Sequence, residues 1–391
     1  MPLEEYRLVD TAQGLTAALA WLDDLDPVGI DVERADWNRY YRAAALIQVG
    51  GDGRVALVDP MALQDLAPLH DFCAGRVVVL HALENDVGPM QSVGVDPTVI
   101  HDTAIAAAIL GMPMGLETLL HEVLDVTLAS DKAAMQRADW EKRPMTDEML
   151  SYAAGDVADL PRLWGILEAK LHEADRWDWY VEEVAAIISQ PNVEQRRDWQ
   201  RTKGVGRLDP MARARAKALW EAREDLARDT DTAPGRIVND KVLVDLALTP
   251  PGNLRELGRR GVRRQAVKTF GEDIVQALQT TATPVPVERA GRRSTDADRE
   301  LSDLLRARRS EIAEEVGLDA GMLCPSRHLL KAVMSDPQSP EELREALGLR
   351  DWQWNLLAEA FIDALFEPLD EMGADDTEAD DTEADDVEAG A

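Results

Sequence analysis

Cysteine, histidine and basic residues are all scarce in this chain of 391 residues. It has two cysteines and six histidines, and 42 lysines and arginines stand against 74 aspartates and glutamates. Cys73 and Cys324 lie far apart in the sequence, which argues against a disulfide framework. No apolar run reaches the ~18 residues that a membrane helix needs, and the amino terminus lacks the basic-then-apolar pattern of a signal peptide. We therefore expect a cytoplasmic protein without a membrane anchor.

Acidic residues dominate the charge, and the formal net charge is −32. Part of this excess is local, because residues 374–391 repeat a short acidic pattern with almost no apolar side chains. Such a segment cannot bury enough surface to offset its ordering entropy, so we expect a disordered acidic tail at 369–391. The net charge therefore argues only weakly against a nucleic acid as partner, and the placement of the basic residues matters more.

Length and patterning indicate several domains. The first half alternates short β-branched runs with helical stretches, which is typical of an α/β domain. Beyond about residue 205 the strand pattern almost vanishes, and segments 235–257 and 321–347 are similar enough to indicate an internal repeat. We expect four parts, namely an α/β domain, two helical domains and the acidic tail, at residues 1–205, 211–283, 295–368 and 369–391.

Four carboxylates and one tyrosine in the α/β part have positions that suggest chemistry. The segment VGIDVE reads as a strand that places Asp31 and Glu33 on one face. The apolar run RVVVLHA reads as a short strand that leads to Asp86. Segment 146–171 has helical periodicity, and Tyr152 and Asp156 share one face of it because they are four residues apart.

Each of these signals has an ordinary alternative when it is taken alone. Asp31 and Glu33 would equally suit a solvated strand face, Asp86 a helix cap, and the pair on the helix an exposed surface. Taken together, clustered carboxylates without neighbouring Cys or His ligands suit Mg²⁺ or Mn²⁺, which prefer oxygen ligands. A carboxylate site that holds two such ions is suited to phosphodiester cleavage. The sequence therefore indicates a nuclease.

The order and spacing of these motifs resemble the DEDD exonuclease superfamily in its tyrosine-containing subgroup, and most closely the RNase D family. Asp31 and Glu33 match the first motif, Asp86 matches the second, and Tyr152 with Asp156 matches the third. Val32 stands where the family frequently has Thr, and Val87 follows Asp86 where the family commonly has Leu, but neither difference changes a ligand. The two helical domains resemble HRDC domains, which are small nucleic-acid-binding modules, and the resemblance covers nearly the whole chain except the tail.

This resemblance implies a fold and an activity. The fold would be a ribonuclease H-like 3′-5′ exonuclease domain with a mixed sheet at 1–205, followed by two all-α HRDC-like domains, of which the second is divergent. The activity would be metal-dependent hydrolysis at RNA 3′ ends to 5′-mononucleotides, in tRNA 3′ processing or RNA turnover. The partner would be RNA with a free 3′ end, tRNA precursors included, and no obligate protein partner is evident.

The resemblance also implies roles for the motif residues. One of two Mg²⁺ or Mn²⁺ ions would be held by Asp31, Glu33 and Asp156, and would lower the pKa of the attacking water. The second ion would be held by Asp31, with help from Asp86 through water, and would stabilise the leaving oxygen. Tyr152 would orient the water by its hydroxyl group.

Basic residues gather at one place in the first helical domain. The cluster consists of Arg255, Arg259, Arg260, Arg263, Arg264 and Lys268. A solvated basic helix face is the simpler interpretation, but beside a nuclease domain we favour a surface that binds RNA, because the arginine fork makes paired hydrogen bonds with phosphate. The second helical domain has Trp352 and Trp354 at the corresponding place, which we expect to pack in the core rather than to stack on bases.

Two other functions stay open at this point. The same chemistry could act on DNA, since HRDC domains occur beside both DNA and RNA enzymes. Alternatively, the chain could be a catalytically silent RNA-binding scaffold, although a scaffold has no need of all four carboxylates and the tyrosine. A requirement for the 2′-hydroxyl, tested with matched RNA and DNA strands, would distinguish an RNA enzyme from a DNA enzyme. A complete absence of hydrolysis would establish the scaffold.

Overall fold

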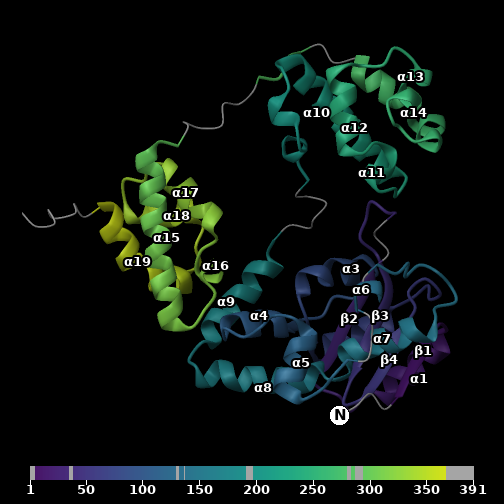
Figure 1. The fold of residues 1–391 in the computed structure, drawn as a ribbon. Coiled ribbons are helices and arrows are strands. Elements are labelled where there is room, and N and C mark those ends of the chain that lie inside the picture. The colour runs from purple at the N-terminus through teal and green to yellow at the C-terminus, as the bar shows by residue number, and fades with distance from the viewer. Residues whose placement is uncertain are drawn as a thin grey trace, which may run out of the picture. The chain divides into compact units, whose positions relative to one another are not determined.

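A computed structural model of the chain describes residues 5–34, 38–128, 132–135, 137–190, 197–279, 283–286 and 294–366. The acidic tail predicted at 369–391 lies outside these residues. Up to residue 190 the elements (Figure 1) are β1 (Glu5–Val9), α1 (Ala12–Trp21), β2 (Val28–Arg34), β3 (Ala44–Gly51), β4 (Arg54–Val58), α2 (Ala67–Ala74), β5 (Val77–Leu80), η1 (Leu83–Asn85), α3 (Val87–Ser92), β6 (Val99–Asp102), α4 (Thr103–Ile109), α5 (Leu116–Leu124), α6 (Lys132–Met135), α7 (Asp147–Ala158), α8 (Leu160–Glu173) and α9 (Trp177–Ile188).

The six strands form one mixed sheet in the order β1-β4-β3-β2-β5-β6. Strand β3 runs antiparallel to β2 and β4, and the other neighbours are parallel. All eight residues of β3 are buried, as expected of a strand that is covered on both faces. A hairpin joins β3 to β4, and Asp52 and Gly53 at its tip both have a positive φ, as a tight two-residue turn requires.

Helix α7 lies against strands β2, β3 and β4 (Figure 1). It begins as predicted, because the Thr146 side chain accepts a hydrogen bond from the Met149 N–H and caps the helix. The single helix predicted over 146–171 is wrong, since α7 ends before Asp159 and α8 starts at Leu160. Pro161 explains the break: it has no N–H to continue the hydrogen bonds of α7, but it fits the first turn of a new helix.

The rest of the described chain contains only helices. After the short turns η2 (Trp199–Arg201) and η3 (Val205–Arg207), the helices are α10 (Pro210–Asp229), α11 (Pro234–Ile237), α12 (Asp240–Leu248), α13 (Leu254–Arg259), α14 (Arg264–Gln279), α15 (Asp296–Val316), α16 (Ala320–Leu323), α17 (Ser326–Met334), α18 (Pro340–Leu347) and α19 (Asp351–Phe366). We call residues 197–279 the first helical module and residues 294–366 the second. The same order of long, four-residue, nine-residue, short and 16-residue helices occurs in both, as the internal repeat predicted.

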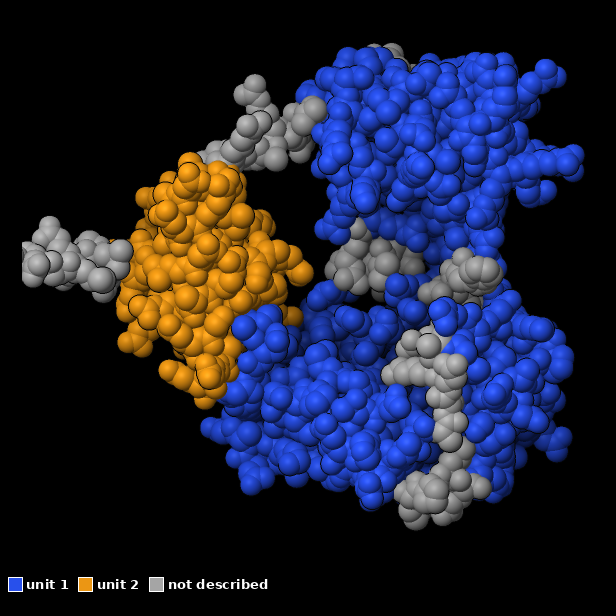
Figure 2. Space-filling view, viewed as in Figure 1, with its two compact units in different colours: residues 1–293, 316–322 blue, residues 294–315, 323–391 orange. Residues whose placement is uncertain are grey.

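The chain forms two compact units, which Figure 2 colours separately. One consists of Met1–Arg293 with Val316–Met322, and the other of Ser294–Glu315 with Leu323–Ala391. The α/β part and the first helical module therefore belong to the same unit. The domain boundaries inferred from the sequence stay predictions. Among the described residues, no helix combines the length and the apolar character that crossing a membrane requires.

Candidate active site

Strand β2 and helix α7 bring three of the predicted carboxylates together. Asp31 and Glu33 alternate with buried Val32 on β2, so both face the same side of the sheet. Helix α7 packs against that strand and supplies Asp156. One carboxylate oxygen from each of the three residues lies within 4.8 Å of the others, and all three side chains are partly exposed. The arrangement can hold a divalent cation that is reached from solvent.

Asp86 is placed differently from these three residues. It follows η1 and is the N-cap residue of α3, as the helix-cap alternative had it, but its side chain makes no capping hydrogen bond. The residue is 3% exposed, and its Oδ2 atom has no hydrogen-bond partner in the described part of the chain. Burial raises the pKa of Asp86 well above its usual range, and the nearby charge of Asp31 adds to the effect.

Asp102 and Thr103 hold the turn that carries Asp86. The Asp102 carboxylate accepts hydrogen bonds from the Leu83 N–H at 2.6 Å and from the Ile105 N–H at 2.8 Å, so it joins the turn to the start of α4. Thr103 Oγ1 lies 2.9 Å from Nδ1 of His81. The orientation of Asp86 thus depends on the side chains of Asp102 and Thr103, 16 and 17 residues further along the chain.

The electrostatics of the cluster favour a bound cation. Burial raises the pKa of Asp31 to about 6. The pKa of Glu33 is raised well above its usual range, first by burial and then by repulsion from Asp31 and Asp156. Ionised carboxylates held this close repel one another, and a cation bound between them removes the penalty. Oδ2 of Asp86 is a further oxygen, without a hydrogen-bond partner among the described residues, so the donor set fits Mg²⁺ or Mn²⁺.

Gln48 is a polar residue of this region that the sequence reading did not identify. It lies on β3 directly opposite Asp31, so the two side chains project from the same face of the sheet. Its exposed fraction is 0%, and neither its amide nitrogen nor its amide oxygen has a partner among the described residues. An unpaired buried amide costs free energy. The available signal was a single polar residue inside the apolar run ALIQVGG.

Tyr152 lies one helical turn before Asp156 on α7. Burial raises the pKa of the Tyr152 phenol, and the negative charges of Asp156 and Glu33 act in the same direction, together with a hydrogen bond to Asp156. The hydroxyl group therefore stays protonated at neutral pH and is available as a hydrogen-bond donor. Its ring lies 6.3 Å from the ring of Trp140, which is buried.

The six predicted RNA-binding residues lie on α13, α14 and the turn between these helices. Five are exposed and Arg260 is half-buried, and none of the six forms an ion pair with another residue that the structure describes. The first helical module has 17 Lys and Arg against 12 Asp and Glu, whereas the second has 8 against 15. In the second module Trp352 is buried, as predicted, and Trp354 is half-buried. Only the first module therefore has a net positive charge.

Comparisons with known proteins agree with this geometry. A family model described as 3′-5′ exonuclease matches residues 6–172, and the HRDC domain model matches residues 212–278 and 298–365. A ribonuclease D of Pseudomonas paraeruginosa is 30% identical over 351 residues, which cover 86% of this chain and 92% of the relative. A ribonuclease D of Sphingobium indicum is 34% identical over 267 residues, which cover 66% of this chain and 68% of the relative.

A comparison of folds finds a similar solved structure. The crystal structure of Escherichia coli RNase D matches with a TM-score of 0.72 at 22% identity, and the match covers 93% of this chain and 99% of that one. At this identity the match shows that the two chains share a fold, with a mixed sheet followed by helical regions. The chain belongs to the ribonuclease D family and is a ribonuclease D-like 3′-5′ exonuclease, a hydrolase whose family uses divalent metal ions.

Proposed function

We propose that this protein is a cytoplasmic 3′-5′ exoribonuclease that shortens RNA from its 3′ end and releases 5′-mononucleotides. The observation that carries the proposal is the cluster of Asp31, Glu33 and Asp156, with oxygens within 4.8 Å of one another and Tyr152 on the same face of α7. Incubation of a 5′-labelled RNA with Mg²⁺ tests it. Stepwise shortening supports the proposal, and internal cleavage or an intact RNA would contradict it.

Four carboxylates would hold the metal in this proposal. We assign one ion to Asp31, Glu33 and Asp156, and a second to Asp31 and Asp86, so the site holds two ions of Mg²⁺ or Mn²⁺. When bound, such ions lower the pKa of water and stabilise the charge that develops on the departing oxygen. Asp156 accepts a hydrogen bond from Tyr152, which keeps the hydroxyl at the edge of the cluster, where it can orient the attacking water.

RNA is the substrate that the relatives favour. The relatives reported above carry the name ribonuclease D, and the Escherichia coli protein is described as an exoribonuclease involved in structured RNA processing. We extend this to RNA with a free 3′ end, and to tRNA precursors as one substrate class. A DNA exonuclease stays the second candidate, since HRDC domains alone do not select RNA. Matched RNA and DNA strands test it, because the 2′-hydroxyl is what distinguishes them.

We assign RNA binding outside the cleavage site to the first helical module. Its six exposed or half-exposed basic residues around the α13–α14 turn have no acidic partners among the described residues, whereas 13 other described arginines form ion pairs with Asp or Glu. Unpaired arginines can bind phosphates and release counterions. The second module has an excess of acidic residues and so does not share this property.

Tyr152→Phe should slow hydrolysis roughly 10- to 100-fold and leave measurable activity, because the carboxylates are kept while the donor to the attacking water is lost. Single-turnover rates on a short RNA at saturating Mg²⁺ measure the effect. Glu148→Gln, an exposed change on the same helix, controls for unspecific effects of a substitution on α7. A Tyr152→Phe enzyme with the wild-type rate would show that the hydroxyl has no role.

Gln48→Met should weaken Mg²⁺ binding while stabilising the metal-free protein. Methionine has a similar length but no amide, so the substitution removes an unpaired buried group. In the metal-bound protein we expect the Gln48 amide to bind a water molecule that the ion retains, so the loss of the amide lowers the affinity for Mg²⁺. Thermal unfolding in EDTA and over a Mg²⁺ titration separates these effects. An unchanged Mg²⁺ midpoint would show that Gln48 does not support the metal site.

A further inference from the structure

The segment that follows the metal-binding strand β2 packs into the first helical module. Tyr40 is 4% exposed and belongs to the hydrophobic core formed by α10–α14, with Leu219, Ile237 and Leu243 among its members. The backbone is joined there as well, because the Ala233 N–H donates to the Asn38 carbonyl at 2.9 Å. A piece of the α/β part thus completes the core of the helical module, within one compact unit.

Asp231 is the residue of the helical module that fixes this segment. It lies in the turn between α10 and α11, with a φ of 45°. Its Oδ1 accepts hydrogen bonds from the N–H groups of Tyr40 and Tyr41, both at 3.1 Å. Its Oδ2 accepts one from Nη1 of Arg39 at 3.0 Å. One carboxylate therefore binds three consecutive residues of the segment.

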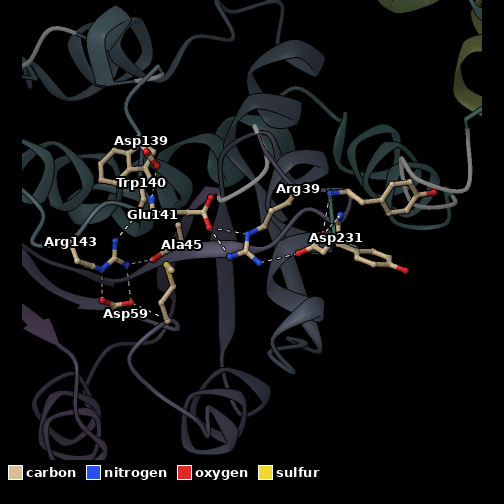
Figure 3. A network of polar contacts seen from close by, with 11 residues as sticks. Arg39, Ala45, Asp59, Asp139, Trp140, Glu141, Arg143 and Asp231 are labelled. Carbon is tan, nitrogen blue, oxygen red and sulfur yellow. Dashed lines mark hydrogen bonds and ion pairs between the residues drawn. The ribbon is translucent and has the colours of Figure 1, made fainter. Parts of the chain in front are cut away.

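Arg39 connects Asp231 to the region of the active site (Figure 3). Its guanidinium donates from Nε and Nη2 to Oε1 of Glu141, at 2.9 and 2.7 Å. Glu141 follows Trp140, whose buried ring lies 6.3 Å from the ring of Tyr152. The contacts thus form a continuous path from Asp231 through Arg39 and Glu141 to the tyrosine on α7.

The segment around Trp140 is also held from the side of the sheet. The Arg143 guanidinium donates to both carboxylate oxygens of Asp59, at 2.6 and 2.8 Å, and to the Ala45 carbonyl at 2.8 Å. Its Nη1 also donates to the Trp140 carbonyl at 2.6 Å. Figure 3 shows Arg143 on one side of Glu141 and Arg39 on the other. Trp140 therefore lies in a short segment that is anchored at one side by the sheet and at the other by the helical module.

We propose that Arg39 and Asp231 are positioning residues, through which the first helical module holds Trp140 against Tyr152 and so contributes to turnover itself. The inference rests on the proposed function and adds a second task to the module besides RNA binding. The side chains of Arg39 and Asp231 are 36% and 37% exposed, so this ion pair adds little to stability. Substitutions there should alter geometry without unfolding the protein.

A substrate too small to reach the helical module tests the proposal on the full-length protein. The p-nitrophenyl ester of uridine 5′-monophosphate keeps the 2′-hydroxyl of RNA and requires only the cleavage site. Arg39→Ala and Asp231→Ala should each lower kcat for this ester about tenfold or more with little change in KM, since a small displacement of a catalytic group has a large effect on rate. RNA binding measured in EDTA should stay within about twofold of wild type, because the phosphate-binding arginines are intact.

Further variants separate positioning from loss of fold. Arg39→Ala combined with Asp231→Ala should be no slower than either single variant, because both act through one path. Asp231→Asn keeps an acceptor for the two backbone N–H groups, so it should recover part of the lost kcat. Asp240→Asn removes an ion pair of 2.7 Å with Arg223 inside the same module, without contact to Arg39, and should leave ester turnover unchanged.

The outcomes distinguish this inference from the proposed function. Wild-type protein that does not hydrolyse the ester with Mg²⁺ or Mn²⁺ would contradict the exonuclease site itself. Wild-type turnover that stays unchanged in folded Arg39→Ala, Asp231→Ala and Asp231→Asn proteins would overturn the positioning role alone. A raised KM with an unchanged kcat would also overturn it, because the network would then serve binding and not the orientation of Tyr152.

Discussion

Asp31→Asn should reduce hydrolysis by on the order of 10³-fold or more, which is the largest effect expected of a single substitution in this protein. Asp31 shares the cluster with Glu33 and Asp156 and is the one residue assigned to both ions. The amide is nearly isosteric but carries no charge, so it is a poor ligand for Mg²⁺. Single-turnover rates with a labelled RNA measure the loss. Binding of the same RNA in EDTA should be retained.

Stability provides the control for this variant. The pKa of about 6 for Asp31 means that folding disfavours its ionised form. The resulting destabilisation is absent below the ordinary pKa near 4 and is fully present above pH 6. Asp31→Asn should therefore raise the melting temperature of the metal-free protein at pH 7 and should lose the extra stability that Mg²⁺ gives. Glu148→Gln, an exposed change on α7, should leave hydrolysis unaltered. Normal turnover by Asp31→Asn would refute the site assignment.

Replacement of Arg259, Arg260, Arg263 and Arg264 by Ala should weaken RNA binding strongly and flatten its salt dependence. Each lost phosphate contact lowers the slope of log K against log salt by about 0.7 for a single strand, so four contacts account for up to roughly 3. Dissociation constants over a KCl series, in an Asp31→Asn background that prevents cleavage, measure both effects. The expected loss is largest at low salt.

A change of two arginines in the second helical module controls for the general loss of positive charge. Arg306 and Arg308 are exposed, but they are paired with Asp303 and Glu311. Arg306→Ala with Arg308→Ala should therefore leave the salt slope almost unaltered. A slope that stays the same in the four-arginine variant would show that the α13–α14 surface does not bind RNA. A slope that falls by the same amount for each arginine removed in both variants would indicate a general charge effect.

Local signals explain why much of the site could be predicted from the sequence. Asp31 and Glu33 alternate on a strand, and Tyr152 and Asp156 are one helical turn apart, so a short stretch of sequence fixes which side chains share a face. The Thr146 cap is equally local. The carboxylate cluster follows from these patterns once the family resemblance pairs the strand with the helix.

The remaining features depend on contacts between distant parts of the chain. The side chains that orient Asp86 are 16 and 17 residues away, and Gln48 faces Asp31 only through the antiparallel register of β2 and β3. The bridge from Arg39 to Asp231 spans 192 residues. Rules on periodicity and capping concern residues a few positions apart, so they do not predict contacts over such sequence separations. Arg39, Glu141 and Asp231 are common residue types in the sequence, and nothing near them indicated the network.

The most direct test of the central claim follows a 5′-labelled RNA with a single-stranded 3′ extension, with wild type and Asp156→Asn side by side. With Mg²⁺, wild type should give a ladder that shortens from the 3′ end, and the ladder should be absent in EDTA and in the variant. Wild-type protein that binds this RNA but gives no ladder with Mg²⁺ or Mn²⁺ would contradict the account and would identify a silent RNA-binding scaffold.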